Sequence, residues 1–373
     1  MNTANHPDRG VATRVLRALL EAARGGRLYL RGSDLIAVAG ETRLERMDPC
    51  GVDAGFTVTA ANVVAGLGSG AVHLVDPEPV ARHLGRSRTA ALRWDGRGLT
   101  VNGQRVNTIE ADTAFGDLRL DLDRPVRSAR FDPERLAAVA AAAGTDSIRY
   151  ALNGVNFDFA AHCLVASDGA RLHASNGDTL SCSGTGPVSV IVPTTAARQM
   201  ADARMGYMRT DGNVVIGLGE GLTLRTYAVD GEFPDYQRLL RPGAALVPVR
   251  LAPTALEALR IADSMGRRSK LTQAGIEIPA RPGTPTLQRT GVTRRVAVPP
   301  VLAGGVGAAS VYLSPGELRD ALLAAGNDAE VLVAAEGSPD TELHGDRLWA
   351  TAPVHVVSPT RPHFRAVVQP LPL

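Results

Sequence analysis

The stretch Ala129-Arg130-Phe131-Asp132-Pro133-Glu134-Arg135-Leu136-Ala137-Ala138-Val139 joins a strand-like run to a helix-like run through a proline. Proline suits the first position of a helix, because its missing N–H would be unpaired there and its φ angle is already helical. Asp132 precedes the proline as a candidate N-cap. The stretch therefore predicts one strand followed directly by one short helix.

The same unit recurs at regular intervals further along the chain. Pro193, Pro253 and Pro315 follow Pro133 at steps of 60, 60 and 62 residues. A short apolar run precedes each of them and a helix-like run follows each, with Ser314 as a candidate N-cap for the last. A recurrence at a fixed period is typical of a repeated supersecondary unit.

Two weaker copies lie upstream. The run Phe56-Thr57-Val58-Thr59 leads into a predicted helix over Ala60–Leu67, and Ala12–Ala23 is predicted as an amphipathic helix. Six units in 373 residues agree with a length that favours two or three domains. We therefore predict three similar domains over residues 1–125, 126–243 and 244–373. Each would be an antiparallel sheet with two short helices, in the α+β class.

Three other segments carry local signals. The alternation in Leu118–Asp123 predicts an edge strand. Asn213–Tyr227 has two apolar arms around a glycine-rich centre and predicts a hairpin. Ala280–Thr293 is rich in Pro, Gly and Thr, which is typical of an exposed loop.

Composition narrows the class of protein. The net charge of +2 supplies no bulk electrostatic attraction to nucleic acid, and Lys270 is the single lysine among 40 basic residues. Three cysteines without a pattern, Cys50, Cys163 and Cys182, fit a reducing compartment. The sequence shows no signal peptide over residues 1–10 and no run long enough to span a membrane. We predict a cytoplasmic protein with no membrane association.

No set of residues points to catalysis. The histidines are scattered, and His162 and Cys163 would point to opposite faces of a strand, so they predict no shared metal. Ser167-Asp168-Gly169 is typical of a turn, in which Asp and Gly serve the backbone geometry. We predict no catalytic residue, no metal and no cofactor, and hence that the protein is not an enzyme.

Several motifs resemble the bacterial sliding clamp, the DNA polymerase III beta subunit. They lie in the family's order and at its distances over about Val126–Leu373, whereas the first third matches more weakly, through Gly25-Gly26-Arg27 and Gly32-Ser33-Asp34-Leu35. The motifs are Arg149-Tyr150-Ala151-Leu152-Asn153-Gly154, Leu164–Leu172, Val229–Tyr236, Ser314-Pro315-Gly316 with Leu318–Leu322, and the terminal Val367–Leu373.

The resemblance implies a DNA clamp fold whose mechanism is topological. Two chains would close head to tail into a homodimeric ring around duplex DNA, touching phosphates without reading the sequence. The ring would tether DNA polymerase, clamp loader and repair proteins through a short peptide motif, which raises their local concentration. The DNA-contacting residues carried over by position are Arg27, Arg149 and Tyr150. Arg198 and Arg204 would face either the hole or solvent.

The resemblance also implies a partner-peptide cleft between the second and third domains. Carried over by position, its residues are Leu152, Ser167, Gly169, Arg171, Leu172, Leu240, Pro242, Val247, Val367, Val368, Pro370 and Leu371. Without the resemblance, Leu152, Leu172 and Val247 would equally suit an ordinary core.

The chain also departs from the family. Glu317 stands where clamps often place an aromatic residue in the cleft wall, and Gln369 stands where they have an apolar one. Asp263 and Ser264 lie near the expected ring-closing edge, where an unpaired Asp would weaken the contact. These departures favour a divergent clamp or a specialised paralogue. The alternative is a clamp-fold scaffold, inhibitor or decoy that no longer encircles DNA.

Overall fold

The structure is a computed structural model of the chain. It describes residues 11–24, 26–39, 56–65, 72–86, 88–111, 118–145, 148–178, 180–241, 245–252, 254–268, 274–278, 286–289, 292–294, 302–304, 308–336, 338–339, 341–344 and 347–371. Within these ranges, no helix is both long and apolar enough to cross a membrane.

The chain divides into two compact units. Unit 1 comprises residues 1–140, 144–164 and 178–233, and unit 2 comprises residues 141–143, 165–177 and 234–373. Both contain antiparallel sheets with helices packed on them, so the predicted α+β class is confirmed. The division into three domains stays a prediction.

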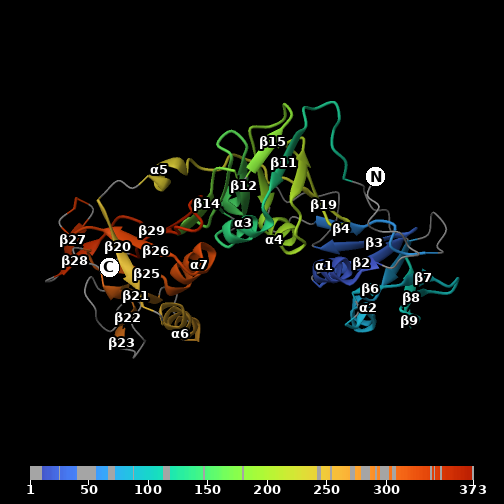
Figure 1. Cartoon of the computed structure of the whole chain (residues 1–373), viewed down its shortest axis with the longest axis horizontal. Helices are drawn as coiled ribbons and strands as arrows, with labels where there is room; N and C mark the ends of the chain where they lie inside the picture. The colour runs from blue at the N-terminus through green and yellow to red at the C-terminus, as the bar shows by residue number, and fades with distance from the viewer. Residues whose placement is uncertain are drawn as a thin grey trace. The chain divides into compact units, whose positions relative to one another are not determined.

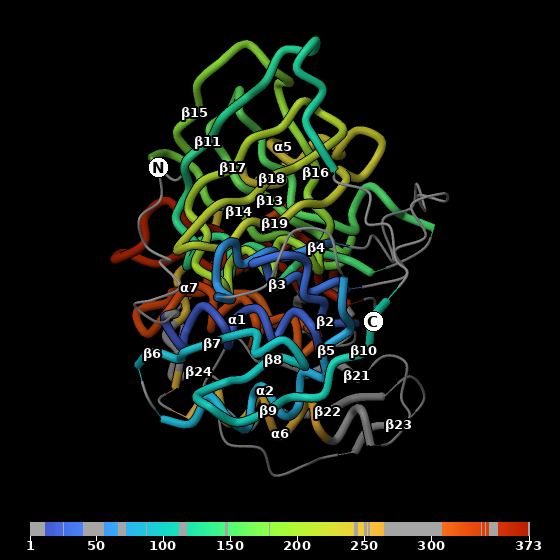
Figure 2. The backbone as a smooth tube through the Cα atoms, turned by 90° about the vertical axis from the view of Figure 1, so that its right-hand side faces the viewer, coloured from blue at the N-terminus to red at the C-terminus, as the bar shows by residue number. Residues whose placement is uncertain are grey.

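Unit 1 is built on a ten-stranded antiparallel sheet with the order β10-β5-β2-β3-β4-β19-β18-β17-β11-β15. In chain order its strands are β2 (Gly26–Arg31), β3 (Asp34–Ala39), β4 (Phe56–Ala60), β5 (Val72–Val75), β10 (Thr108–Glu110), β11 (Arg127–Phe131), β15 (Leu180–Ser183), β17 (Tyr207–Thr210), β18 (Val214–Gly219) and β19 (Leu222–Tyr227). Strands β4 and β19 lie side by side, with Leu222 opposite Ala60 (Figure 2). The first and second thirds of the chain therefore share one sheet.

Smaller groups of strands complete unit 1. These are the pair β1 (Val11–Ala12) and β6 (Thr89–Ala90), the meander β7 (Leu92–Trp94), β8 (Leu99–Val101) and β9 (Gln104–Val106), and the pair β12 (Gly154–Asp158) and β16 (Ser189–Pro193). A 3-10 turn, Tyr150–Leu152, precedes β12.

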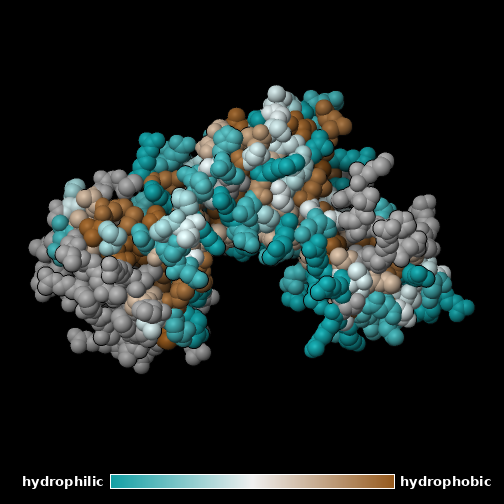
Figure 3. All heavy atoms as spheres, viewed as in Figure 1, coloured by the Kyte–Doolittle hydropathy of each residue, from teal (hydrophilic) through white to brown (hydrophobic). Residues whose placement is uncertain are grey.

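Four helices of unit 1 pack in two pairs. Helix α1 (Thr13–Ala23) contacts α2 (Pro77–Leu84), and α3 (Pro133–Ala140) contacts α4 (Thr194–Asp202) (Figure 1). The amphipathic pattern of α1 explains its place: it buries apolar residues on β2, β3 and β4 and exposes charged ones. The surface over α1 is accordingly hydrophilic in Figure 3.

The prolines that define the repeat do not all start helices. Pro133 and Pro315 are the first helical residues, as predicted, and Asp132 caps α3 by accepting a hydrogen bond from the Glu134 N–H at 2.9 Å. Pro193 instead ends β16 and serves as the N-cap of α4, so that prediction is wrong by one residue. Pro253 lies outside the described residues.

The helix predicted over Ala60–Leu67 is wrong as far as the structure describes that segment. Ala60 ends β4, and Asn62 adopts a left-handed φ of 56°, which a helix cannot continue. The N–H groups of Val63 and Val64 both donate to the carbonyl of Ser33. The second helix of this region is α2, where Asp76 caps the helix and Pro77 begins it.

Two other local predictions need correction. Leu118–Asp123 is not a strand, because its backbone forms a turn. A hydrogen bond from the Asp121 N–H to Asp211 Oδ2, at 2.7 Å, fixes this turn. The loop predicted over Ala280–Thr293 contains strand β22 and the start of β23. The hairpin over Asn213–Tyr227 is confirmed as β18 and β19, with positive φ angles at Glu220 and Gly221 in its turn.

Unit 2 is built on six neighbouring antiparallel strands with the order β14-β30-β29-β26-β20-β24. They are β14 (Arg171–Ser175), β20 (Leu246–Leu251), β24 (Leu302–Gly304), β26 (Glu330–Ala334), β29 (Val354–Val357) and β30 (Phe364–Val368). Strand β13 (Cys163–Ser167) lies beside β14 and begins in unit 1.

A second sheet and three helices accompany these strands. The sheet has the order β23-β22-β21-β25, formed by β21 (Ala274–Ile278), β22 (Thr286–Arg289), β23 (Val292–Arg294) and β25 (Val311–Leu313), and β27 (Thr341–His344) pairs with β28 (Arg347–Ala350). The helices are α5 (Gln237–Leu240), α6 (Ala255–Arg268) and α7 (Pro315–Ala325). Helix α7 packs on α6, β29 and β30, which buries Leu318, Ala321 and Leu322.

Candidate functional site

The turn between β13 and β14 is rigid because its own side chains satisfy its backbone. Asp168 Oδ1 accepts hydrogen bonds from the N–H groups of Ala170 and Arg171, each at 3.0 Å. Ser167 Oγ donates to the carbonyl of Arg171 at 2.7 Å, and Gly169 supplies a φ of 93°. The predicted turn is confirmed, and it fixes Arg171 at the start of β14.

Arg171 is mostly buried and joins two carboxylates. Its Nε donates to Asp168 Oδ2 at 3.0 Å, and its Nη1 donates to Asp320 Oδ2, on α7, at 2.7 Å. The side chain is 14% exposed, so these pairs are only partly screened by solvent. Burial alone would raise the pKa of Asp320, but hydrogen bonds from Arg171 and Arg319 hold it below its usual range.

The ion pairs continue from α7 to α6. Arg319 donates from Nη2 to Asp320 Oδ1 at 3.0 Å and from Nη1 to Asp263 Oδ2 at 3.0 Å. Asp168, Arg171, Asp320, Arg319 and Asp263 thus form one continuous series, which we call the ion-pair chain. It connects the β13–β14 turn to both long helices of unit 2.

The ion-pair chain corrects the expectation for Asp263 and Ser264. Asp263 is not an unpaired charge, because Arg319 neutralises it inside unit 2 and its side chain is only 15% exposed. Ser264 Oγ donates to the carbonyl of Ile261 at 2.8 Å, within its own helix. Neither residue presents an unsatisfied polar group of the kind that would penalise a contact.

Glu317 lies beside the ion-pair chain, in the first turn of α7. Burial, reinforced by the negative charge of Asp168, raises its pKa to about 7, although Arg171 and a hydrogen bond with Ser314 oppose the shift. Its Oε2 is buried without a hydrogen-bond partner among the described residues. The predicted polar substitution in the cleft wall is therefore a half-buried acid that titrates near neutral pH.

The terminal segment, whose described part after β30 is Gln369-Pro370-Leu371, runs past the ion-pair chain and Glu317. The Gln369 N–H donates to the Ala170 carbonyl at 2.8 Å, and the Leu371 N–H donates to the Tyr312 carbonyl at 2.8 Å. The Gln369 side chain is exposed, and Pro370 and Leu371 are half-buried. The segment thus connects the β13–β14 turn to β25, the strand that precedes α7.

The strand register divides the predicted cleft residues between two faces. Leu172 lies opposite Val367, and that row continues through β29 and β26 to Pro248. Side chains of directly opposite residues share a face, and neighbouring residues along a strand alternate. Val247, one position before Pro248, therefore shares the other face with Arg171 and Val368, on the side that α7 covers.

The remaining predicted cleft residues lie in different places. Leu240 ends α5, where its carbonyl accepts a hydrogen bond from Arg365 Nη1. Leu152 is buried in unit 1, and Pro242 lies outside the described residues. Leu172, Val367 and Val368 are buried, whereas Val247 is half-buried.

The predicted DNA-contacting residues all belong to unit 1, and all five are exposed. They are Arg27 on β2, Arg149 and Tyr150 at the 3-10 turn, Arg198 on α4, and Arg204 just after α4. Arg198 Nη2 reaches the Ala140 carbonyl at 3.4 Å, which places it across the α3–α4 pair. Burial and the charge of Glu21 raise the pKa of Asp202, while Arg198 opposes that shift.

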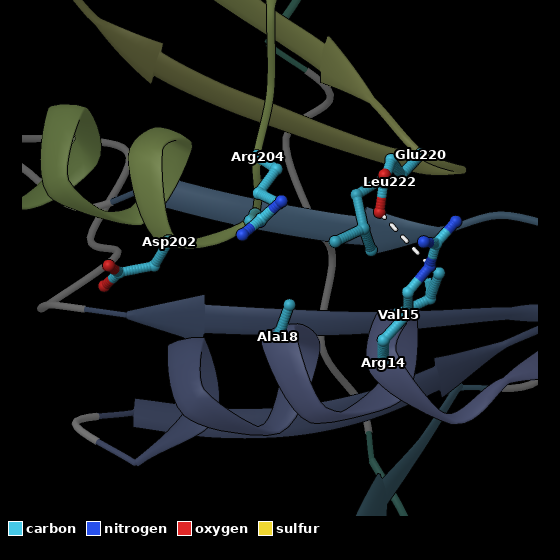
Figure 4. Close-up of a pocket in the computed structure, with 8 residues that line it drawn as sticks. Arg14, Val15, Ala18, Asp202, Arg204, Glu220 and Leu222 are labelled. Atoms are coloured by element: carbon cyan, nitrogen blue, oxygen red, sulfur yellow. Dashed lines mark ion pairs between the residues drawn. The ribbon is translucent and has the colours of Figure 1, made fainter. Parts of the chain in front are cut away.

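Arg204 lines a pocket of about 240 Å³ formed by α1, the end of α4 and the β18–β19 turn (Figure 4). Arg14 closes one side through an ion pair with Glu220 at 3.3 Å, and Asp202 borders the other side. Two carboxylates thus accompany the two arginines, so the pocket offers no surplus of either charge.

Solved structures with the same fold are known. The beta subunit of DNA polymerase III from Thermotoga maritima superposes with a TM-score of 0.65 over 97% of this chain and 98% of that one, at 18% identity. The Helicobacter pylori beta clamp bound to a DNA ligase peptide has a TM-score of 0.61 over 99% of both chains at 15% identity. A sliding clamp from Pseudomonas aeruginosa bound to griselimycin has a TM-score of 0.59 over 97% of both, at 16% identity.

No protein-family model and no curated protein matches the sequence. The chain has the α+β clamp fold over nearly its whole length. The three solved structures are bacterial DNA polymerase III beta subunits, or sliding clamps, and at 15–18% identity they show that this chain has a divergent version of the same fold.

Sequence reasoning missed the partners that organise the site. It named Arg171, Glu317 and Asp263 singly, but not Asp320 and Arg319, which connect them. The pairs Arg171–Asp320 and Arg319–Asp263 join residues 149 and 56 positions apart. No local pattern in one sequence signals pairs at such distances.

Proposed function

We propose that this protein is a DNA sliding clamp or a specialised clamp paralogue. Two copies close head to tail into a ring of six similar domains around duplex DNA, using the three-domain division predicted from the repeat. The observation that carries the proposal is the fold match over 97% of this chain and 98% of the Thermotoga maritima subunit, which leaves no large part of the clamp architecture without a counterpart. The role is mechanical and non-enzymatic, and it is exercised in the cytoplasm, where DNA is replicated.

The exposed residues of unit 1 support a contact with the DNA backbone. Arg27, Arg149 and Arg198 are exposed, and guanidinium groups bind phosphate without reading the bases. Tyr150 is 40% exposed beside Arg149. Because the net charge is only +2, binding would depend on a few local contacts and would be weak and sensitive to salt.

The elements around the ion-pair chain support a site for partner peptides. Polymerase, clamp-loader and repair proteins would present a short motif to the cleft that Arg171, Val247 and the terminal segment outline. A clamp of the same fold, from Helicobacter pylori, is bound to a DNA ligase peptide, which supports peptide capture as a role of this chain. Peptides that insert apolar anchors beside fixed polar groups gain both affinity and register.

The solution mass tests the ring. Sedimentation equilibrium at tens of micromolar should give twice the chain mass of 39.1 kDa, because a two-fold head-to-tail ring needs two copies. A mass of 39.1 kDa throughout that range would favour the alternative, a clamp-fold scaffold, inhibitor or decoy that does not encircle DNA.

A further inference from the structure

Glu317 is set apart from the neighbouring carboxylates by its bonding. Asp168, Asp320 and Asp263 each accept at least one hydrogen bond from a guanidinium group. Glu317 forms no ion pair within hydrogen-bonding distance among the described residues, and its Oε2 is buried there without a partner. An unsatisfied buried carboxylate oxygen is costly, and that cost is relieved when a donor reaches it.

The chain's own cations near Glu317 are already engaged. Arg171 directs its Nε and Nη1 to Asp168 and Asp320, and Arg319 divides its donors between Asp320 and Asp263. The charged groups that act on Glu317 directly are Asp168 and Arg171 from the β13–β14 turn and Asp320 from α7, and the ion-pair chain continues from Asp320 through Arg319 to Asp263. Counted with Glu317 ionised, they are four carboxylates against two guanidinium groups, which leaves a net negative charge.

Glu317 and the neighbouring terminal segment are partly accessible to solvent. The Glu317 side chain is half-buried rather than sealed, and so are Pro370 and Leu371 in the terminal segment. That segment is tied to Ala170 on one side and to Tyr312 on the other, so it borders the start of α7. A peptide that docks along it would pass beside a carboxylate whose Oε2 lacks a donor among the described residues.

We propose that Glu317 makes this cleft select partner peptides that carry a basic side chain beside their apolar anchor. The inference rests on the proposed peptide-binding function and adds the chemistry of the partner. A lysine or arginine of the peptide would donate to Glu317 and offset the net negative charge of the cluster. A purely apolar peptide would instead bury Glu317 further without supplying a donor, so it would favour the protonated acid.

Two matched peptides, Gln-Leu-Ser-Leu-Phe and Gln-Leu-Lys-Leu-Phe, test this with the full chain by isothermal titration at pH 6 and pH 8. A pKa of about 7 makes Glu317 about nine-tenths protonated at the lower pH and about nine-tenths ionised at the higher one. The lysine peptide should bind about tenfold more tightly than the serine peptide at pH 8. The serine peptide should bind more tightly at pH 6 than at pH 8, and the lysine peptide should show the opposite trend.

The variant Glu317→Gln should remove both the preference and the opposed pH trends, because a neutral amide neither titrates nor attracts a cation. The matched control is Glu330→Gln, which neutralises an exposed acid on β26 and should behave as the unchanged protein. The inference would be overturned if the unchanged protein bound the two peptides with equal affinity and Glu317→Gln did not alter those affinities. The proposed peptide-binding function would survive that result. Absence of binding by either peptide at both pH values would overturn the proposed cleft, and the inference with it.

Discussion

Arg319 Nη1 lies 3.0 Å from Asp263 Oδ2, and this ion pair joins helix α7 to helix α6. The two helices approach closely here: a Cβ added at Gly316 would lie 3.0 Å from Asp263 Oδ1. The Asp263 side chain is 15% exposed and the Arg319 side chain 23%, so the pair is largely shielded from water. Removing one partner would take a charge-assisted hydrogen bond from the other in a largely dry environment, although Arg319 would keep its bond to Asp320.

We therefore expect Arg319→Ala to lower the free energy of unfolding by about 1–3 kcal/mol, measured by urea denaturation followed by circular dichroism. Asp263→Ala should cost a similar amount, and the double variant should cost less than the sum of the two. The control is Arg260→Ala on the same helix, whose ion pair with Glu257 is solvent-exposed and should contribute nothing measurable. Additive effects of the two substitutions would show that the pair is not coupled.

The raised pKa of Glu317 predicts a pH dependence of stability. An acid whose pKa is higher in the folded state favours folding while it is protonated, and that contribution is lost as the pH rises from about 4.5 to about 7. Glu317→Gln should therefore be more stable than the unchanged chain at pH 8 by about 1–2 kcal/mol, after allowance for solvent screening, and this advantage should vanish at pH 4.

His355 gives the free energy of unfolding the opposite dependence on pH over part of the same pH range. Burial, aided by Arg365, lowers its pKa to about 4, so its contribution to stability is lost as the pH falls from about 6.5 to about 4. The difference between Glu317→Gln and the unchanged chain, measured at each pH, cancels this background. A difference that is the same at pH 4 and pH 8 would contradict the assignment for Glu317.

The terminal segment should be required for peptide binding but not for folding. Its described part makes two backbone hydrogen bonds, from Gln369 to Ala170 and from Leu371 to Tyr312, while Val367 and Val368 lie within β30. Deleting Gln369–Leu373 should thus abolish binding of Gln-Leu-Ser-Leu-Phe, measured by fluorescence anisotropy, with a small decrease in melting temperature. Equal affinity of the full-length and shortened chains would show that the segment is not part of the cleft.

Arginines of unit 1 should govern contact with DNA. Arg27→Ala and Arg149→Ala should each weaken binding to duplex DNA and reduce its salt dependence by about one phosphate contact, without creating a sequence preference. A matched control is Arg130→Ala, because Arg130 is exposed on β11 between the buried Ala129 and Phe131 and hence points away from the core side of that strand. An equal loss with the control variant would indicate unspecific attraction to basic charge.

The sequence predicted the fold well where the signals were local. Asp132-Pro133 and Ser314-Pro315 mark helix starts because a proline in the first turn acts locally; Asp132 adds a side-chain cap, whereas Ser314 occupies the N-cap position without a capping hydrogen bond. Asp76-Pro77 carries the same signal and begins α2, whereas the predicted helix after Ala60 does not form in the described residues. There, hydrogen bonds to the distant Ser33 carbonyl override helix propensity.

The site was less accessible to sequence reasoning because its order depends on long-range contacts. The sequence marks Glu317 as a departure from the family, but its burial and the unpaired state of its Oε2 depend on how the surrounding elements pack. Likewise, Asp263 was expected to be unpaired because its partner Arg319 lies 56 positions away. Such contacts depend on how the helices pack and not on any pattern along the chain.

Encirclement of DNA is the central claim, and retention on DNA of different topology tests it most directly. Protein assembled on a nicked circular plasmid should stay bound during gel filtration in high salt, which removes phosphate contacts, and should be lost when the plasmid is cut once. A ring cannot leave a circle but slides off a linear end. Equal retention on the circular and the linearised plasmid, or no retention on either, would contradict the account.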